Sequence, residues 1–229
     1  MKNKIKDIII TSYNKALSER REFYLNGAIV QVLNPLKSPI DLEKVISLLK
    51  EKIPSYILNL IDIYYIGDFD VFKKKNTNAA YMDGAIYLSN DQDSEKDILD
   101  DIIHELGHAL IEKDKINIFV DDLVRQEFVA KKNTLKKTLK AKGYDIPKSF
   151  NTTRFSQEMD DFLYRTVGYE TLRPLINGLF TSPYGITSLE EYFTTGMEDY
   201  FLGKSLLLKT ISPQLYNKME FYDELGKNL

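Results

Sequence analysis

The fold prediction for this chain starts from His104-Glu105-Leu106-Gly107-His108. On an α-helix, residues four apart lie on one face about one turn apart, so both imidazoles can reach a single metal ion from the same side. The glutamate directly after the first histidine would then lie beside the ion, where its carboxylate can accept a proton from water. The chain has two histidines in total, so chance would have to place both at this spacing.

The flanks of the motif predict a mostly buried helix that begins near Asp93 or Ser94. An unpaired imidazole on such a helix would be costly, which favours metal binding over an ordinary solvated helix. The apolar positions along one side of this helix recur every four residues, at Ile98, Ile102, Leu106 and Leu110.

Composition narrows both the class of protein and the ligands that a metal can have. The chain has 229 residues, 43% of them apolar, which fits one compact domain with or without a subdomain. Its formal net charge of -3 provides no overall field for nucleic acid or an anionic membrane. Cysteine is absent, so any metal must be held by His, Asp or Glu.

No stretch of the sequence is apolar for long enough to cross a bilayer, so no membrane insertion is expected. The basic segment Met1 to Thr11 contains only a short apolar run, Ile8 to Ile10, which is no signal-peptide core. The sequence therefore predicts a cytoplasmic location. Association with a virus particle, or export without a signal, would leave the same sequence.

The first half of the chain mixes predicted helices with predicted strands. Asp83-Gly84 lies between two short apolar runs and is a strong hairpin signal, because both turn residues need positive φ. From about Phe119 onward the pattern is helical to the end, with interruptions at 143–151 and 181–185. The other expected elements are a helix over 2–24, a strand over 28–33, a helix from Asp41 to about Lys52, a strand over 63–66, and the hairpin strands 78–82 and 85–89.

A catalytic zinc takes three protein ligands plus water, so two histidines leave the site one ligand short. The third must be a carboxylate here, and the best candidates are Glu190 and Glu191. Adjacent helical residues point about 100° apart, so at most one of them faces the metal. Spacing alone leaves both open.

At this point the chain resembles the catalytic domain of anthrax lethal factor and the related Pro-Pro endopeptidases, within the thermolysin-like zincins. The resemblance lies in the metal motif and in Tyr184-Gly185 followed by Glu191-Tyr192-Phe193. It implies that Glu191 is the third zinc ligand. It also implies that the Tyr184 hydroxyl stabilises the oxyanion of the reaction or protonates the leaving amine.

The predicted hairpin also resembles these enzymes, in which an edge strand pairs with an extended peptide substrate. By this resemblance the cleft is lined by Asn78, Ala79, Ala80 and Tyr81. Thr195 departs from the group, which has a second glutamate there, four residues after the ligand, so the resemblance assigns no partner that orients the zinc site.

A helical insertion between about Lys115 and Arg165 is a second departure, and it carries a basic cluster over 131–142. We expect this cluster to be a solvated helix face. The alternative is a binding site for an acidic protein substrate.

Together these observations predict an α+β, zincin-like fold with one zinc ion per chain. A lobe over 1–112 would carry a small mixed sheet packed on the motif helix, and a mainly helical lobe over 113–229 would supply the third ligand. The expected activity is zinc-dependent hydrolysis of internal bonds in a protein or peptide, with Glu105 as general base. Two alternatives remain: a catalytically silent module of the same fold, favoured by Thr195, and a hydrolase of non-peptide amides.

Overall fold

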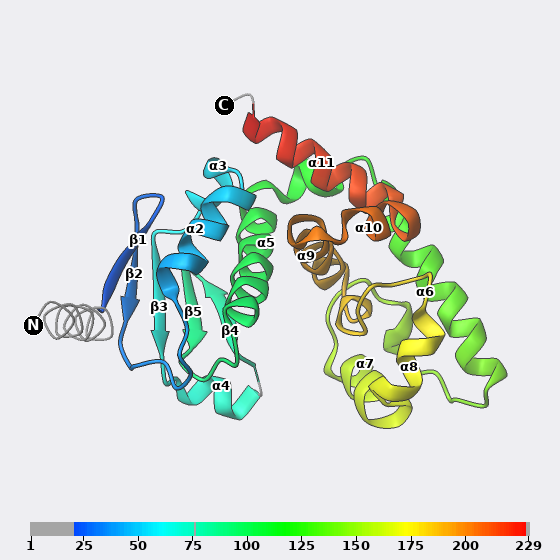
Figure 1. Cartoon of the computed structure of the whole chain (residues 1–229). Helices are drawn as coiled ribbons and strands as arrows, with labels where there is room; N and C mark the ends of the chain where they lie inside the picture. The colour runs from blue at the N-terminus through cyan, green and yellow to red at the C-terminus, as the bar shows by residue number, and fades with distance from the viewer. Residues whose placement is uncertain (1–20, 76, 228–229) are drawn as a thin grey trace, which may run out of the picture.

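A computed structural model describes residues 21–75 and 77–227 of the chain, and it is a mixed α+β structure (Figure 1). The first half contains β1 (Glu22–Leu25), β2 (Ala28–Val32), α2 (Leu42–Lys52), α3 (Ser55–Leu58), β3 (Ile63–Gly67), α4 (Asp70–Lys75), β4 (Ala79–Met82), β5 (Ala85–Ser89) and α5 (Glu95–Phe119). The second half contains α6 (Leu123–Ala141), η1 (Lys148–Asn151), α7 (Gln157–Asp161), η2 (Phe162–Val167), α8 (Tyr169–Ile176), η3 (Tyr184–Ile186), α9 (Leu189–Asp199), η4 (Tyr200–Lys204), α10 (Ser205–Ile211) and α11 (Pro213–Lys227).

The five strands form one mixed sheet in the order β1-β2-β3-β5-β4. The two inner pairs, β2 with β3 and β3 with β5, are parallel, whereas β1 and β4 each pair antiparallel with their neighbour. Among the described residues, β4 is therefore an edge strand. It lies next to the helix that carries the metal motif (Figure 1).

The predicted helix over residues 2–24 is wrong where the structure describes it. Residues 2–20 lie outside the described residues, and Glu22–Leu25 form the strand β1. Its side chains alternate between exposed and buried, which is the period of a strand with one face on the core. A two-residue turn at Asn26 (φ 51°) and Gly27 (φ 95°) then leads into β2, and this Asn-Gly pair is the hairpin signal that the prediction missed.

The other predicted elements of the first half are confirmed within a residue or two. The strand over 28–33 is β2, the helix from Asp41 is α2, and the strand over 63–66 is β3. The hairpin forms as predicted, with Asp83 (φ 49°) and Gly84 (φ 77°) at its turn. The short helices α3 and α4 had no counterpart in the prediction.

Helix α5 begins at the Ser94 cap, whose side chain accepts a hydrogen bond from the N–H of Asp97. Its apolar side packs into the core as predicted, with Ile98, Ile102, Leu106 and Leu110 all buried. The helix bends at Asp114 (φ -133°, ψ 27°), close to the residue at which we expected one lobe to give way to the next. Figure 1 shows the sheet and α2 on one side of α5 and the helices α6 to α10 on the other. Helix α11 crosses above α5, and the Tyr56 hydroxyl of α3 donates to the Tyr222 carbonyl of α11 at 2.7 Å.

The second half is mainly helical, as predicted, with its longest non-helical stretches near 142–147, 152–156 and 177–183. The predicted interruptions at 143–151 and 181–185 are wrong in part, because η1 and the start of η3 fall inside them, and the stretch over 152–156 was not predicted. The expectation that the basic cluster over 131–142 is a solvated face is wrong for two of its members. Lys131 and Lys132 are buried, because they lie on the side of α6 that packs on the rest of the second half. Within the described residues, no helix combines the length and the apolar character needed to cross a bilayer.

Candidate metal centre

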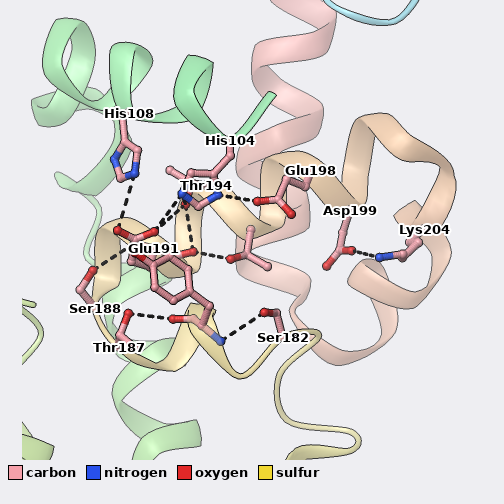
Figure 2. Close-up of polar contacts among 12 residues, drawn as sticks. His104, His108, Ser182, Thr187, Ser188, Glu191, Thr194, Glu198, Asp199 and Lys204 are labelled. Carbon is pink, nitrogen blue, oxygen red and sulfur yellow. Dashed lines mark hydrogen bonds and ion pairs between the residues drawn. The ribbon is translucent and has the colours of Figure 1, made fainter. Parts of the chain in front are cut away.

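The two histidines of α5 and one glutamate of α9 converge on a single point (Figure 2). Nε2 of His104 lies 3.0 Å from Oε2 of Glu191, and Nε2 of His108 lies 3.6 Å from Oε1 of the same carboxylate. One ligand atom from each of the three residues lies within 4.8 Å of the others. The packing of two helices thus brings Glu191 to two histidines that lie 83 or more positions earlier in the chain.

This donor set fits a zinc ion. Two ligand atoms at about 2.1 Å from a tetrahedral zinc lie roughly 3.4 Å apart, which is close to the two nitrogen-to-oxygen distances given above. Two imidazoles and a carboxylate are also ligands that zinc accepts in catalytic sites. With three protein ligands, a tetrahedral ion keeps one position for water or substrate.

The start of α9 decides which of the two candidate glutamates reaches the histidines. Ser188 caps the helix and accepts a hydrogen bond from the N–H of Glu191 at 3.0 Å, which holds the first turn in place. Glu191 faces inward and is buried, whereas Glu190 points away and forms an ion pair with Lys115 at 2.6 Å. Of the two glutamates that spacing left open as third ligand, Glu191 is the one that reaches the histidines.

A glycine inside the motif allows α5 and α9 to approach closely. A Cβ atom at Gly107 would lie 2.9 Å from Cγ2 and 3.1 Å from Cα of Thr194, both too near for an unstrained contact. A larger residue would therefore push α9 away and withdraw Glu191 from the histidines. The sequence motif leaves this position open, so the role of Gly107 was not predicted.

Glu198 is the functional candidate that sequence reasoning missed. Its Oε1 lies 2.5 Å from Nδ1 of His104, on the opposite side of the ring from Glu191 (Figure 2). A carboxylate that accepts the Nδ1 proton leaves Nε2 free to bind a metal. Glu198 lies seven residues after Glu191, and positions seven apart share a helix face, which was the available signal.

The general-base candidate Glu105 is buried beside the histidines and is held by the edge strand. The main-chain N–H of Tyr81 donates a hydrogen bond to Oε2 of Glu105 at 2.6 Å. Burial raises the pKa of Glu105 to about 7, although His104 and the Tyr81 N–H oppose this rise. A carboxyl group with a pKa near neutrality can both accept a proton and return it.

Charges within the cluster are strongly coupled. Burial disfavours a charged His104, but hydrogen bonds to Glu191 and Glu198 outweigh burial and raise its pKa to about 10. Burial lowers the pKa of His108, which favours the neutral imidazole. Burial pushes the pKa of Glu191 upward, yet its contacts with the two histidines outweigh this and leave it below the ordinary value. A bound cation would replace the proton that now links His104 to Glu191.

Tyr184 lies next to this cluster, on the short helix η3 that precedes α9. The centroid of its ring is 6.0 Å from that of His104, and the main-chain N–H of Tyr184 donates to Ser182 Oγ at 3.2 Å. Burial, together with the charge of Glu191, raises the pKa of its phenol, so the hydroxyl keeps its proton at neutral pH. It is thus available as a hydrogen-bond donor to a reacting group.

The four cleft residues expected from the hairpin differ in what they present. The N–H of Ser89 donates to the carbonyl of Asn78 at 2.7 Å, so these two residues form a hydrogen-bonded pair. Pairs alternate along an antiparallel ladder, so Ala80 also faces β5, whereas the main-chain groups of Ala79 and Tyr81 point away from the sheet. Asn78 itself lines a small pocket of about 160 Å³ next to the first residue of β4.

Comparisons of this chain with protein-family models, with curated proteins and with solved structures found no match.

Proposed function

We propose that this chain is a zinc-dependent endopeptidase. The observation that carries the proposal is the convergence of His104, His108 and Glu191 on one point, with the buried carboxylate of Glu105 close enough to interact electrostatically with His104 and Glu191. Burial of polar groups is costly unless they have partners, and two imidazoles with one carboxylate are a ligand set that zinc accepts. The resemblance of the motif and of the Tyr184 to Phe193 block to lethal-factor-like enzymes points to the same activity.

Zinc in this site would supply Lewis-acid chemistry, polarising a carbonyl group and lowering the pKa of water. The carboxylate of Glu105, held by the Tyr81 N–H, is positioned to take the proton of the attacking water and to pass it to the leaving amine. The phenol of Tyr184 donates a hydrogen bond to the developing oxyanion.

The edge strand β4 suits an extended peptide substrate. The outward main-chain groups of Ala79 and the outward carbonyl of Tyr81 can pair with a peptide lying antiparallel or parallel to β4. Such pairing recognises the main chain of the substrate rather than its side chains. A peptide of several residues should therefore bind better than a small amide.

Zinc content and peptide cleavage test this proposal with one matched pair of variants and one catalytic variant. We expect wild type and Glu190→Ala to bind one zinc ion per chain, and Glu191→Ala to lose it, because Glu191 faces the histidines whereas Glu190 pairs with Lys115. Glu105→Gln should keep its zinc but cleave a peptide library at least ~100-fold more slowly. Equal cleavage by Glu105→Gln and wild type would overturn the endopeptidase proposal. A wild type that binds zinc and cleaves neither peptides nor small amides would favour the silent module.

A further inference from the structure

A buried polar network lies behind the candidate metal centre and joins three helices. Nζ of Lys131 on α6 donates hydrogen bonds to the phenol oxygen of Tyr192 on α9 at 2.6 Å and to Oγ of Ser212 at 2.5 Å. The hydroxyl of Tyr192 in turn donates to Oε1 of Glu127 at 2.8 Å. Neither Lys131 nor Glu127 has a role in the proposed reaction.

Glu127 extends the network to the last helix. Its carboxylate accepts hydrogen bonds from the main-chain N–H of Gln214 at 2.9 Å and of Leu215 at 3.3 Å, both in the first turn of α11. A carboxylate at this position satisfies amide groups that a helix N-terminus leaves unpaired. One side chain of α6 thus ties the start of α11 to Tyr192 of α9.

Three members of the network are buried, and Glu127 is partly exposed. Lys131, Tyr192 and Ser212 are 8%, 4% and 1% exposed, and the ammonium of Lys131 lies 5.0 Å from the ring centroid of Tyr192. Burial of an ammonium group is unfavourable, and it lowers the pKa of Lys131 to about 8, with Glu127 opposing the change. Replacement of buried ionic groups by well-packed apolar side chains is often neutral or stabilising, so stability alone does not explain this lysine.

The position of Tyr192 in the chain supplies that explanation. Tyr192 directly follows Glu191 in the first turn of α9, and the two side chains point about 100° apart around the helix. Fixing the phenol therefore fixes the rotation of α9 about its own axis, and with it the direction of the Glu191 carboxylate. The opposite side of α9 meets α5 at the close contact between Gly107 and Thr194.

We propose that Lys131 and Glu127 are positioning residues for Glu191, acting through the hydroxyl of Tyr192 to aim the third ligand at the two histidines. This inference rests on the proposed zinc site. It gives a function to the helical insertion that contains α6, because that segment supplies both residues.

A second buried lysine provides the matched control. Lys132 is 4% exposed, lies 5.2 Å from the ring centroid of Phe128, and donates to the carbonyl of Thr152 at 2.9 Å. It thus resembles its neighbour in burial and surroundings, but its hydrogen bond ends on a loop rather than on α9. Removal of either ammonium group should change stability, whereas removal of that of Lys131 alone should change metal binding.

The test compares zinc affinity, measured by competition with a chelator, in full-length Lys131→Met and Lys132→Met proteins. We expect the dissociation constant to rise roughly tenfold in Lys131→Met, at the lower end of the range for residues that orient metal ligands, and to stay within twofold of wild type in Lys132→Met. Tyr192→Phe keeps the ring and removes the hydroxyl, so it should weaken zinc binding as Lys131→Met does. The double variant Lys131→Met/Tyr192→Phe should bind zinc no more weakly than either single variant, because both changes break the same hydrogen bond.

Thermal melting of each variant shows that it is folded, and Tyr192→Phe alone decides the matter if Lys131→Met fails to fold. Zinc affinities equal to wild type in both Lys131→Met and Tyr192→Phe would overturn the positioning role while leaving the zinc site intact. So would an equal loss in Lys131→Met and Lys132→Met. A wild-type protein that binds no zinc would instead remove the proposed function itself.

Discussion

Nδ1 of His104 lies 2.5 Å from Oε1 of Glu198, and this contact joins the motif helix to the second turn of α9 beyond Glu191. The lethal-factor-like enzymes that the chain resembles have a glutamate four residues after the third ligand, where this chain has Thr195. Thr195 instead donates its hydroxyl to the carbonyl of Glu191 at 2.7 Å. Glu198, about one turn further along the same helix, gives His104 a carboxylate partner, so Thr195 by itself does not favour the silent module.

Replacement of Glu198 by alanine should weaken zinc binding about 10- to 100-fold, because His104 would lose the acceptor that fixes its tautomer and ring orientation. Chelator competition measures the change. Glu190→Ala is the control, since that glutamate lies on the same helix and pairs with Lys115 at the surface. If Glu198→Ala and Glu190→Ala bind zinc equally well, Glu198 has no part in the site.

The parts of the site that follow from local geometry were predictable from the sequence. His104, Glu105 and His108 belong to one helix, whose regular period fixes their relative directions. The Asp83-Gly84 turn is equally local, because both residues adopt the positive φ that the turn requires. The choice between Glu190 and Glu191 was not local. It depended on how the Ser188 cap and the packing at Gly107 rotate α9 against α5.

Burial of charged residues was the least predictable feature. Lys131 and Lys132 lie in a run of lysines for which the sequence predicts a solvated helix face. Other lysines of the same run are exposed, as predicted, namely Lys137, Lys140 and Lys142. What distinguishes the first two is their set of partners, namely tyrosine, serine and main-chain oxygens far along the chain. Such partners are set by tertiary packing, so composition and period give no sign of them.

Tyr184→Phe should retain zinc and lose about 10²- to 10³-fold in the rate of peptide cleavage at saturating substrate, because the variant lacks a donor to the developing oxyanion. The ring itself, packed near His104, is unchanged in this variant. Tyr164→Phe removes an exposed hydroxyl from the same half of the molecule and should cleave at the wild-type rate. Equal rates in wild type and Tyr184→Phe would exclude this role for the hydroxyl.

Proline substitutions distinguish the two sides of the edge strand. The N–H of Ala79 points away from β5, so Ala79→Pro should fold and keep its zinc but show a higher KM for peptides. The N–H of Ala80 faces β5, so Ala80→Pro should lower the melting temperature, since it removes a ladder hydrogen bond. Steady-state kinetics and thermal melts measure the two effects. A wild-type KM in Ala79→Pro would argue against substrate pairing with β4.

The buried Lys132 should make the stability of the protein rise with pH. Burial lowers its pKa from 10.5 to about 8, so between these values the folded protein has released a proton that the unfolded chain still binds. Rising pH disfavours the state that binds more protons, which here is the unfolded state, so the free energy of unfolding increases. Each pKa unit corresponds to about 1.4 kcal/mol, so the gain on going from pH 7.5 to 10 is on the order of 2 kcal/mol.

Urea denaturation of wild type and Lys132→Met across this range isolates the effect, because contributions from other groups, including the tyrosines, cancel in the difference. At pH 7 the lysine is charged in both states, and we expect Lys132→Met to be the more stable protein, since it buries no ammonium group. As pH rises past 8, the free energy of unfolding of wild type should increase relative to that of Lys132→Met. Lys137→Met, at an exposed position of the same helix, should show no such change with pH. A difference between wild type and Lys132→Met that stays constant from pH 7.5 to 10 would mean that Lys132 titrates normally in the folded protein.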